Sequence, residues 1–140
     1  MKEKMDNIIK RARELRESQL PHYNCAQSVL MPFAKMAEVD EEILRNIAAN
    51  FGGGMKRGSV CGAVTGGLMA LGLMGKDDPG TIEKYYAKLN LNHSNMLDCK
   101  DLLDRNERLG QQKKPFCDGL VFECVKLVEM LIGDQKESRI

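Results

Sequence analysis

The sequence predicts an all-α fold, a compact single-domain bundle of about five to six helices. Apolar residues recur at spacings of three and four along most of the chain, and no segment alternates convincingly at a period of two. No repeat, linker or low-complexity segment divides the 140 residues. We therefore expect one helical domain over residues 1–140, with an N-terminal helix over 1–20 and a core over 22–132.

Capping residues and prolines set the bounds of the first two predicted helices. The first helix carries an apolar stripe formed by Met5, Ile8, Ile9, Ala12 and Leu15. Pro21 ends this helix, and Asn24 then caps the second, with Gln27 at the spacing of a capping box. Pro32 lies within the second helix, so we expect it to kink or shorten that helix.

The same signals predict the remaining helices. They are expected at about residues 40–51, 59–74, 81–91, from 98 onward, and 115–131. Asp40, Ser59 and Asp98 are the expected caps, and Pro115 opens the last helix.

Composition and charge disfavour two classes of partner. Lys and Arg number 21 against 20 for Asp and Glu, so the basic excess of a nucleic-acid-binding domain is missing. The longest uncharged stretch, 58–75, contains six glycines and is too polar to span a bilayer by itself. The N-terminus is charged and lacks the apolar run of a secretory signal. We therefore expect a cytoplasmic protein without membrane insertion.

Five cysteines are unusual in such a protein, because structural disulfides are uncommon in a reducing compartment. Cys25, Cys61, Cys99 and Cys117 each fall in a predicted first helical turn. The partial positive charge of a helix N-terminus favours a thiolate, the form that attacks disulfides and binds metals. Lys56 and Arg57, shortly before Cys61, act in the same direction. Cys124 lies in mid-helix on an apolar face, where we expect it to pack in the core.

A row of small residues marks the helix that follows Cys61. Gly62, Gly66 and Ala70 lie on one face at spacings of four. Glycine inside a helix costs about 1 kcal/mol relative to alanine, so a close approach is expected at this face. Either another helix packs there, or Gly62 and Gly66 bring a cofactor or a reacting partner close to Cys61.

Residues 61–66 (Cys-Gly-Ala-Val-Thr-Gly) carry a family resemblance. Together with the blocks at 23–27, 51–55 and 98–99, and with Cys117, they resemble the redox-active family named for the pattern C–GCAxxG–C–C. The resemblance covers about residues 23–131. It implies that Cys25, Cys61, Cys99 and Cys117 are the motif cysteines, with Cys124 outside the pattern, and the fourth assignment is the least secure. It implies redox chemistry without naming a substrate.

Three functions remain open at this level. The first is a thiol-redox protein, an oxidoreductase in the enzymatic case, in which Cys61 is the reactive thiolate and Cys25, Cys99 or Cys117 resolves the mixed disulfide formed with a small thiol or a partner protein. The second is a carrier of an iron–sulfur cluster or another metal on the same four cysteines. The third is a non-catalytic helical interaction module. The glycine face is also compatible with a homo-oligomer. The sequence leaves the substrate, the electron donor and the cysteine pairing undecided.

Overall fold

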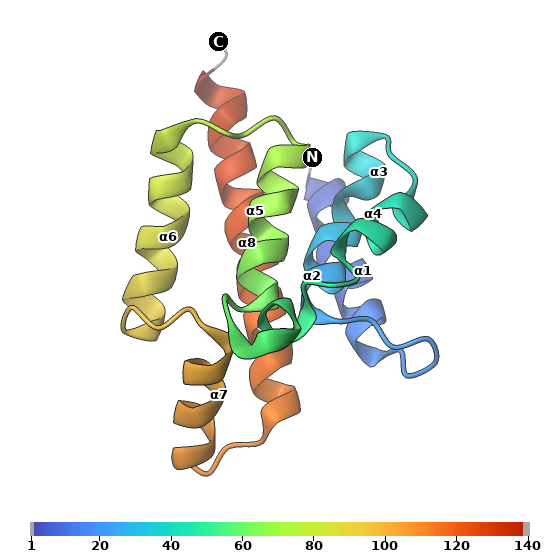
Figure 1. Cartoon of the computed structure of the whole chain (residues 1–140). Helices are drawn as coiled ribbons and strands as arrows, with labels where there is room; N and C mark the ends of the chain where they lie inside the picture. The colour runs from blue at the N-terminus through green and yellow to red at the C-terminus, as the bar shows by residue number, and fades with distance from the viewer. Residues whose placement is uncertain (1, 139–140) are drawn as a thin grey trace.

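The computed structural model describes the backbone of residues 2–138 and the side chains of residues 7–133. Within residues 2–138 the chain forms eight α-helices and no β-strand (Figure 1). In chain order they are α1 (Lys2–Glu17), α2 (Cys25–Leu30), α3 (Ala34–Ala37), α4 (Glu41–Ala48), α5 (Gly62–Leu73), α6 (Pro79–His93), α7 (Cys99–Arg108) and α8 (Lys113–Ser138). The all-α prediction is confirmed, with more helices than the five to six expected.

The long helix α8 packs against most of the other helices. It lies beside α5 in the middle of the molecule, with α6 on one side and α1 to α4 on the other (Figure 1). Helix α2 packs against both α5 and α8, while α7 lies next to the first turns of α8 (Figure 1). None of the described helices is long and apolar enough to cross a membrane.

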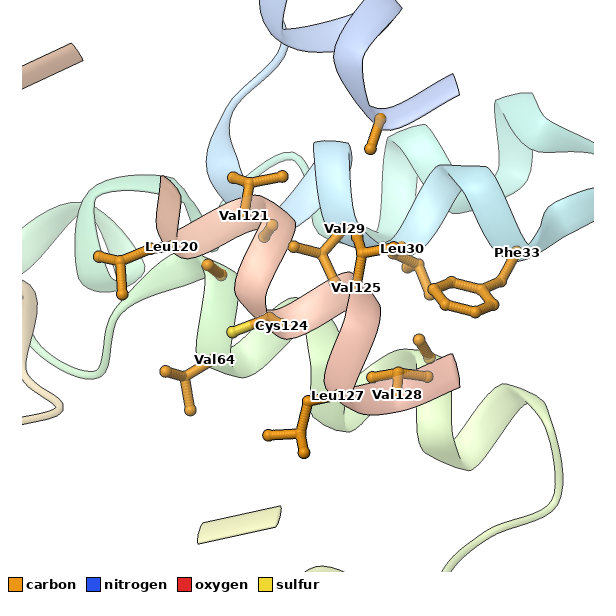
Figure 2. Close-up of a cluster of buried hydrophobic side chains, with 14 of the residues drawn as sticks. Val29, Leu30, Phe33, Val64, Leu120, Val121, Cys124, Val125, Leu127 and Val128 are labelled. Carbon is orange, nitrogen blue, oxygen red and sulfur yellow. The ribbon is translucent and has the colours of Figure 1, made fainter. Parts of the chain in front are cut away.

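Branched aliphatic side chains from α2, α5 and α8 form the centre of the core. Val29, Val64, Val121 and Val125 are completely buried, and Figure 2 shows them around the sulfur-bearing side chain of Cys124. Burying such a side chain contributes about 1.5–3 kcal/mol to folding. Cys124 therefore packs in the core, as its place on an apolar helix face predicts.

The second predicted helix is divided, which accounts for part of the higher helix count. The capping box is present: Asn24 Oδ1 accepts from the Gln27 amide at 2.8 Å, and Gln27 Oε1 accepts from the Asn24 amide at 2.9 Å. A 3₁₀ helix over Met31–Phe33 then separates α2 from α3. Pro32 lies in this short segment, where its missing amide hydrogen and fixed φ angle favour a break in the α-helix.

Two helix starts differ from the sequence-based expectation. Cys61, not Ser59, is the N-cap of α5, because Ser59 belongs to a turn that its own amide closes by donating to Gly54 O at 2.8 Å. Helix α8 begins at Lys113 rather than near Pro115. As a result Cys117 lies in the second turn of α8, not the first.

Candidate functional site

A cavity of about 620 Å³ lies where the starts of α2, α5, α7 and α8 meet. Its walls include all four motif cysteines, namely Cys25, Cys61, Cys99 and Cys117. Cys61 is buried, whereas the other three are partly exposed. A second cavity, of about 680 Å³ between α1 and the α3–α4 region, has no cysteine among its lining residues. The structure thus brings four sulfur-bearing residues from distant segments to one cavity.

Asn24 fixes the position of Cys25, the first residue of α2. Besides forming the capping box, its side-chain amide donates to the carbonyl oxygens of Ala48 and Ala49 at 3.3 and 3.1 Å. Gly52 makes room for it, since a Cβ at Gly52 would lie 2.4 Å from Asn24 Cβ. The start of α2 is therefore tied to the end of α4.

A short antiparallel bridge joins the starts of α5 and α7. The Cys61 amide donates to Leu97 O at 2.7 Å, and the Cys99 amide donates to Ser59 O at 2.6 Å. Gly54, with φ of +65°, lies directly beneath this bridge, and a Cβ there would be 2.4 Å from Ser59 O and 2.8 Å from Cys99 Cβ. The backbone at this point therefore requires glycine.

A buried ion pair links α1 to the cavity beside Cys117. Arg16, only 9% exposed, donates through Nε to Asp118 Oδ1 at 2.7 Å and through a terminal nitrogen to Tyr23 O at 3.2 Å. Lys114 donates to Asp118 Oδ2 at 3.0 Å and to Arg16 O at 3.1 Å. Arg16 and Lys114 both line the cavity.

Cys25 and Cys117 interact directly. The Cys117 thiol donates a hydrogen bond to the Cys25 sulfur, and this bond lowers the pKa of Cys25 to about 6 against the opposing effect of burial. The positive charge of Arg16 lowers the pKa of Cys25 further. The same hydrogen bond, together with burial, raises the pKa of Cys117. The pair therefore holds one proton and one negative charge near neutral pH, with the charge on Cys25.

The surroundings of Cys61 do not favour a thiolate. Burial raises its pKa to about 11, although the amides of Ala63 and Val64 act in the opposite direction. The Lys56 ammonium, expected to favour a Cys61 thiolate, instead donates to Asn50 Oδ1 at 2.9 Å. Burial also raises the pKa of Cys99. Cys25, not Cys61, is thus the most acidic thiol of the cavity.

Residues 23–131 match the model of a family described as "Putative redox-active protein (C_GCAxxG_C_C)". The chain belongs to this family. No curated protein and no solved structure matches the chain.

In the family name the motif is given as glycine followed by cysteine, whereas in this chain Cys61 precedes Gly62.

The close approach expected at this motif is made by α2. A Cβ at Gly66 would lie 2.8 Å from Ala26 O, and one at Gly62 would lie 3.3 Å from Ala26 N and 3.4 Å from Cys25 Cβ. Helix packing therefore accounts for the glycine spacing, and at Gly66 no room is left for a cofactor. Gly62 also borders the cavity.

The expected metal site on the family's cysteines does not fit the observed side chains. Among the side chains that the structure describes, no group of three or more His, Cys, Asp and Glu is arranged to hold a metal ion. Cys25 and Cys117 are close enough to share a proton, but the four sulfurs do not form a common ligand set.

The sequence did not reveal every charged residue of the cavity of this C_GCAxxG_C_C protein. Arg16 looks like part of a solvated, mixed-charge helix face, yet it is buried against Asp118, 102 positions away. Lys100 and Lys113 also border the cavity. Their place next to Cys99 and at the start of the last helix is the one signal that could have drawn attention to them.

Proposed function

We propose that this protein carries out thiol–disulfide exchange with Cys25 as the attacking thiolate and Cys117 as the resolving thiol. The observation that carries this proposal is that Cys25 and Cys117 border the same cavity, where the interaction with Cys117 and the charge of Arg16 favour the Cys25 thiolate. Membership of a family described as redox-active supports it. The sequence favours Cys61 as the attacking thiolate, but Cys61 is only 5% exposed and its pKa is raised, so we assign this role to Cys25.

The proposed reaction has two exchange steps. The Cys25 thiolate attacks one sulfur of a disulfide R–S–S–R′, forming a Cys25–S–S–R mixed disulfide and releasing R′–S⁻, which takes a proton from water. In the mixed disulfide the Cys25 sulfur is neutral, so its negative charge no longer raises the pKa of the Cys117 thiol. Cys117 then deprotonates and attacks the Cys25 sulfur, releasing R–S⁻, which receives that proton. The protein dithiol is oxidised by two electrons, and R–S–S–R′ is reduced to two thiols.

The geometry suits the second step. Both thiols border one cavity and each affects the pKa of the other, so a bridge forms when the two sulfurs approach to the disulfide bond length of about 2.05 Å. The reverse reaction, with a small thiol or a dithiol partner protein as reductant, restores the starting state. We place this cycle in the cytoplasm, where thiols are kept reduced.

Mass mapping after mild oxidation tests the proposal. The reduced protein would be treated with one equivalent of a neutral disulfide, the remaining thiols alkylated and the peptides mapped. We expect a Cys25–Cys117 disulfide in the wild type and in Cys61→Ala, and a stable mixed disulfide on Cys25 in Cys117→Ser. A bridge between other cysteines would contradict the proposed pair. No reaction while the fold is intact would contradict thiol–disulfide exchange and favour a non-catalytic module.

A further inference from the structure

The cavity around Cys25 is lined by basic side chains and by no acidic ones. Four cationic side chains line it, Arg16, Lys100, Lys113 and Lys114, and no aspartate or glutamate is among its lining residues. Arg16 lies in α1, Lys100 follows Cys99 at the start of α7, and Lys113 and Lys114 begin α8, the helix that carries Cys117. The charges of Arg16 and Lys113 act directly on Cys25.

Only part of this positive charge is neutralised by the protein. Arg16 and Lys114 are both bonded to Asp118, just outside the lining residues. Lys100 and Lys113, by contrast, form no ion pair or hydrogen bond within residues 7–133. The cavity thus has two ammonium groups without a carboxylate partner, and the anionic group that the charge of Lys113 reaches is the Cys25 thiolate. A cleft lined by cations raises the local concentration of an anionic ligand.

The remaining walls limit the ligand further. Leu102, Leu103, Phe116 and Leu120 add an apolar surface. A volume of about 620 Å³ is within the range of small-molecule sites and is too small for a folded protein. Gly58 packs against the base of the Lys100 side chain, since a Cβ there would lie 3.2 Å from Lys100 Cβ.

We propose that the cavity selects a low-molecular-weight disulfide that carries carboxylates, with Lys100 and Lys113 binding the carboxylates and Cys25 attacking the disulfide. This inference rests on the proposed function, because it assigns the R–S–S–R′ of that reaction. The exchange is unchanged: one S–S bond of the ligand is broken, one forms between Cys25 and Cys117, and two electrons pass to the ligand.

The test compares two disulfide probes of different charge. One is the dianionic 5,5′-dithiobis(2-nitrobenzoate), and the other is the neutral 2,2′-dithiodipyridine. Rates of reaction at Cys25 would be measured for the wild type and for the double variant Lys100→Gln/Lys113→Gln. Lys84→Gln, at an exposed site on α6 away from the cavity, is the matched control. The neutral probe corrects for any change in the reactivity of Cys25 itself.

We expect the ratio of the dianionic to the neutral rate to fall about five- to tenfold in the double variant and to stay unchanged in Lys84→Gln. High salt should lower the wild-type ratio in the same way. An unchanged ratio in the double variant would overturn the inference, while reaction of both probes at Cys25 would leave the proposed function intact. Failure of both probes to react at Cys25 would overturn the proposed function itself.

Discussion

Cys25 and Cys61 border the same cavity, yet their thiols differ by several orders of magnitude in acidity. Cys61, the N-cap of α5, has two backbone amides that favour its thiolate, but burial raises its pKa to about 11. Cys25 is also largely shielded, and its pKa is lowered to about 6. The difference lies in the partners, because Cys25 receives a hydrogen bond from Cys117 and lies near the charge of Arg16.

This contrast shows that a helix start does not by itself make a thiol reactive. The dipole of a helix end is worth about 0.3–1 kcal/mol at an exposed site. Removing a charged sulfur from water costs more than that unless a donor or a cation replaces the water. A reactive cysteine is therefore identified by what faces its sulfur.

The largest expected effect comes from removing the Cys25 sulfur. Cys25→Ser should lower the rate of reaction with a neutral disulfide at pH 7 by about 30-fold or more, because an ordinary thiol is only about 3% ionised at that pH. Cys61→Ala is the matched variant and should leave the rate within about twofold of wild type. Stopped-flow absorbance of the released thiol measures both. Equal losses in the two variants would remove the distinction between the two thiols.

The hydrogen bond from Cys117 can be tested separately from its sulfur chemistry. Cys117→Ala removes the donor and should raise the pKa of Cys25 by about one pH unit or more, since a hydrogen bond to a charged group contributes about 1.5–3 kcal/mol. Cys117→Ser keeps a donor and should leave the pKa of Cys25 much closer to its wild-type value. Alkylation of Cys25 as a function of pH gives both values. If alanine and serine act alike, the hydrogen bond does not set this pKa.

Arg16 should matter for both acidity and stability. Arg16→Gln removes a cation near Cys25 and leaves Asp118 facing it, so the pKa of Cys25 should rise. The free energy of unfolding should fall by about 1.5 kcal/mol, the low end for a hydrogen bond to a charged group, because Lys114 still binds Asp118. Arg11 lies in the same helix as Arg16 and forms a more exposed ion pair with Glu41 of α4. Arg11→Gln should lower the free energy of unfolding by less than about 1 kcal/mol. Urea denaturation compares the two, and a larger loss in Arg11→Gln would show that Arg16 is not a buried anchor.

The smallest expected effect concerns the packing that holds α2 against α5. Gly66→Ala would place a methyl group 2.8 Å from Ala26 O, and the overpacking should exceed the gain in helix propensity by about 1 kcal/mol. Gly72→Ala in the same helix has no atom within 4 Å of the added Cβ and should be stabilising by about 0.5–1 kcal/mol. Thermal unfolding would show opposite shifts. Shifts of the same sign would contradict the close approach of α2 at Gly66.

The sequence predicted the elements of this fold better than the contacts between them. The spacing of Leu120, Val121, Cys124 and Val128 indicates the buried face of α8, and the Asn24–Gln27 capping box indicates the start of α2. Such signals are local, since they depend on residues within one or two helical turns.

What could not be predicted depends on tertiary packing. Nothing near Arg16 in the sequence indicates a bond to Asp118, and nothing near Cys25 indicates that Cys117 lies beside it. The backbone from Gly53 to Lys56 is left-handed at four successive residues, two of them not glycine, and hydrogen bonds with Phe51 and Ser59 hold this turn. The four cysteines could be identified from the motif, but the order of their acidities could not.

The pH dependence of alkylation at each cysteine of the wild-type protein tests the central claim most directly. Iodoacetamide labelling at a series of pH values, read by mass spectrometry peptide by peptide, gives a separate midpoint for every thiol. Because the thiolate is the nucleophile, labelling of Cys25 should rise as the pH passes through about 6, long before Cys61 reacts. A Cys25 midpoint at or above that of an ordinary thiol, about 8.5, would contradict the account.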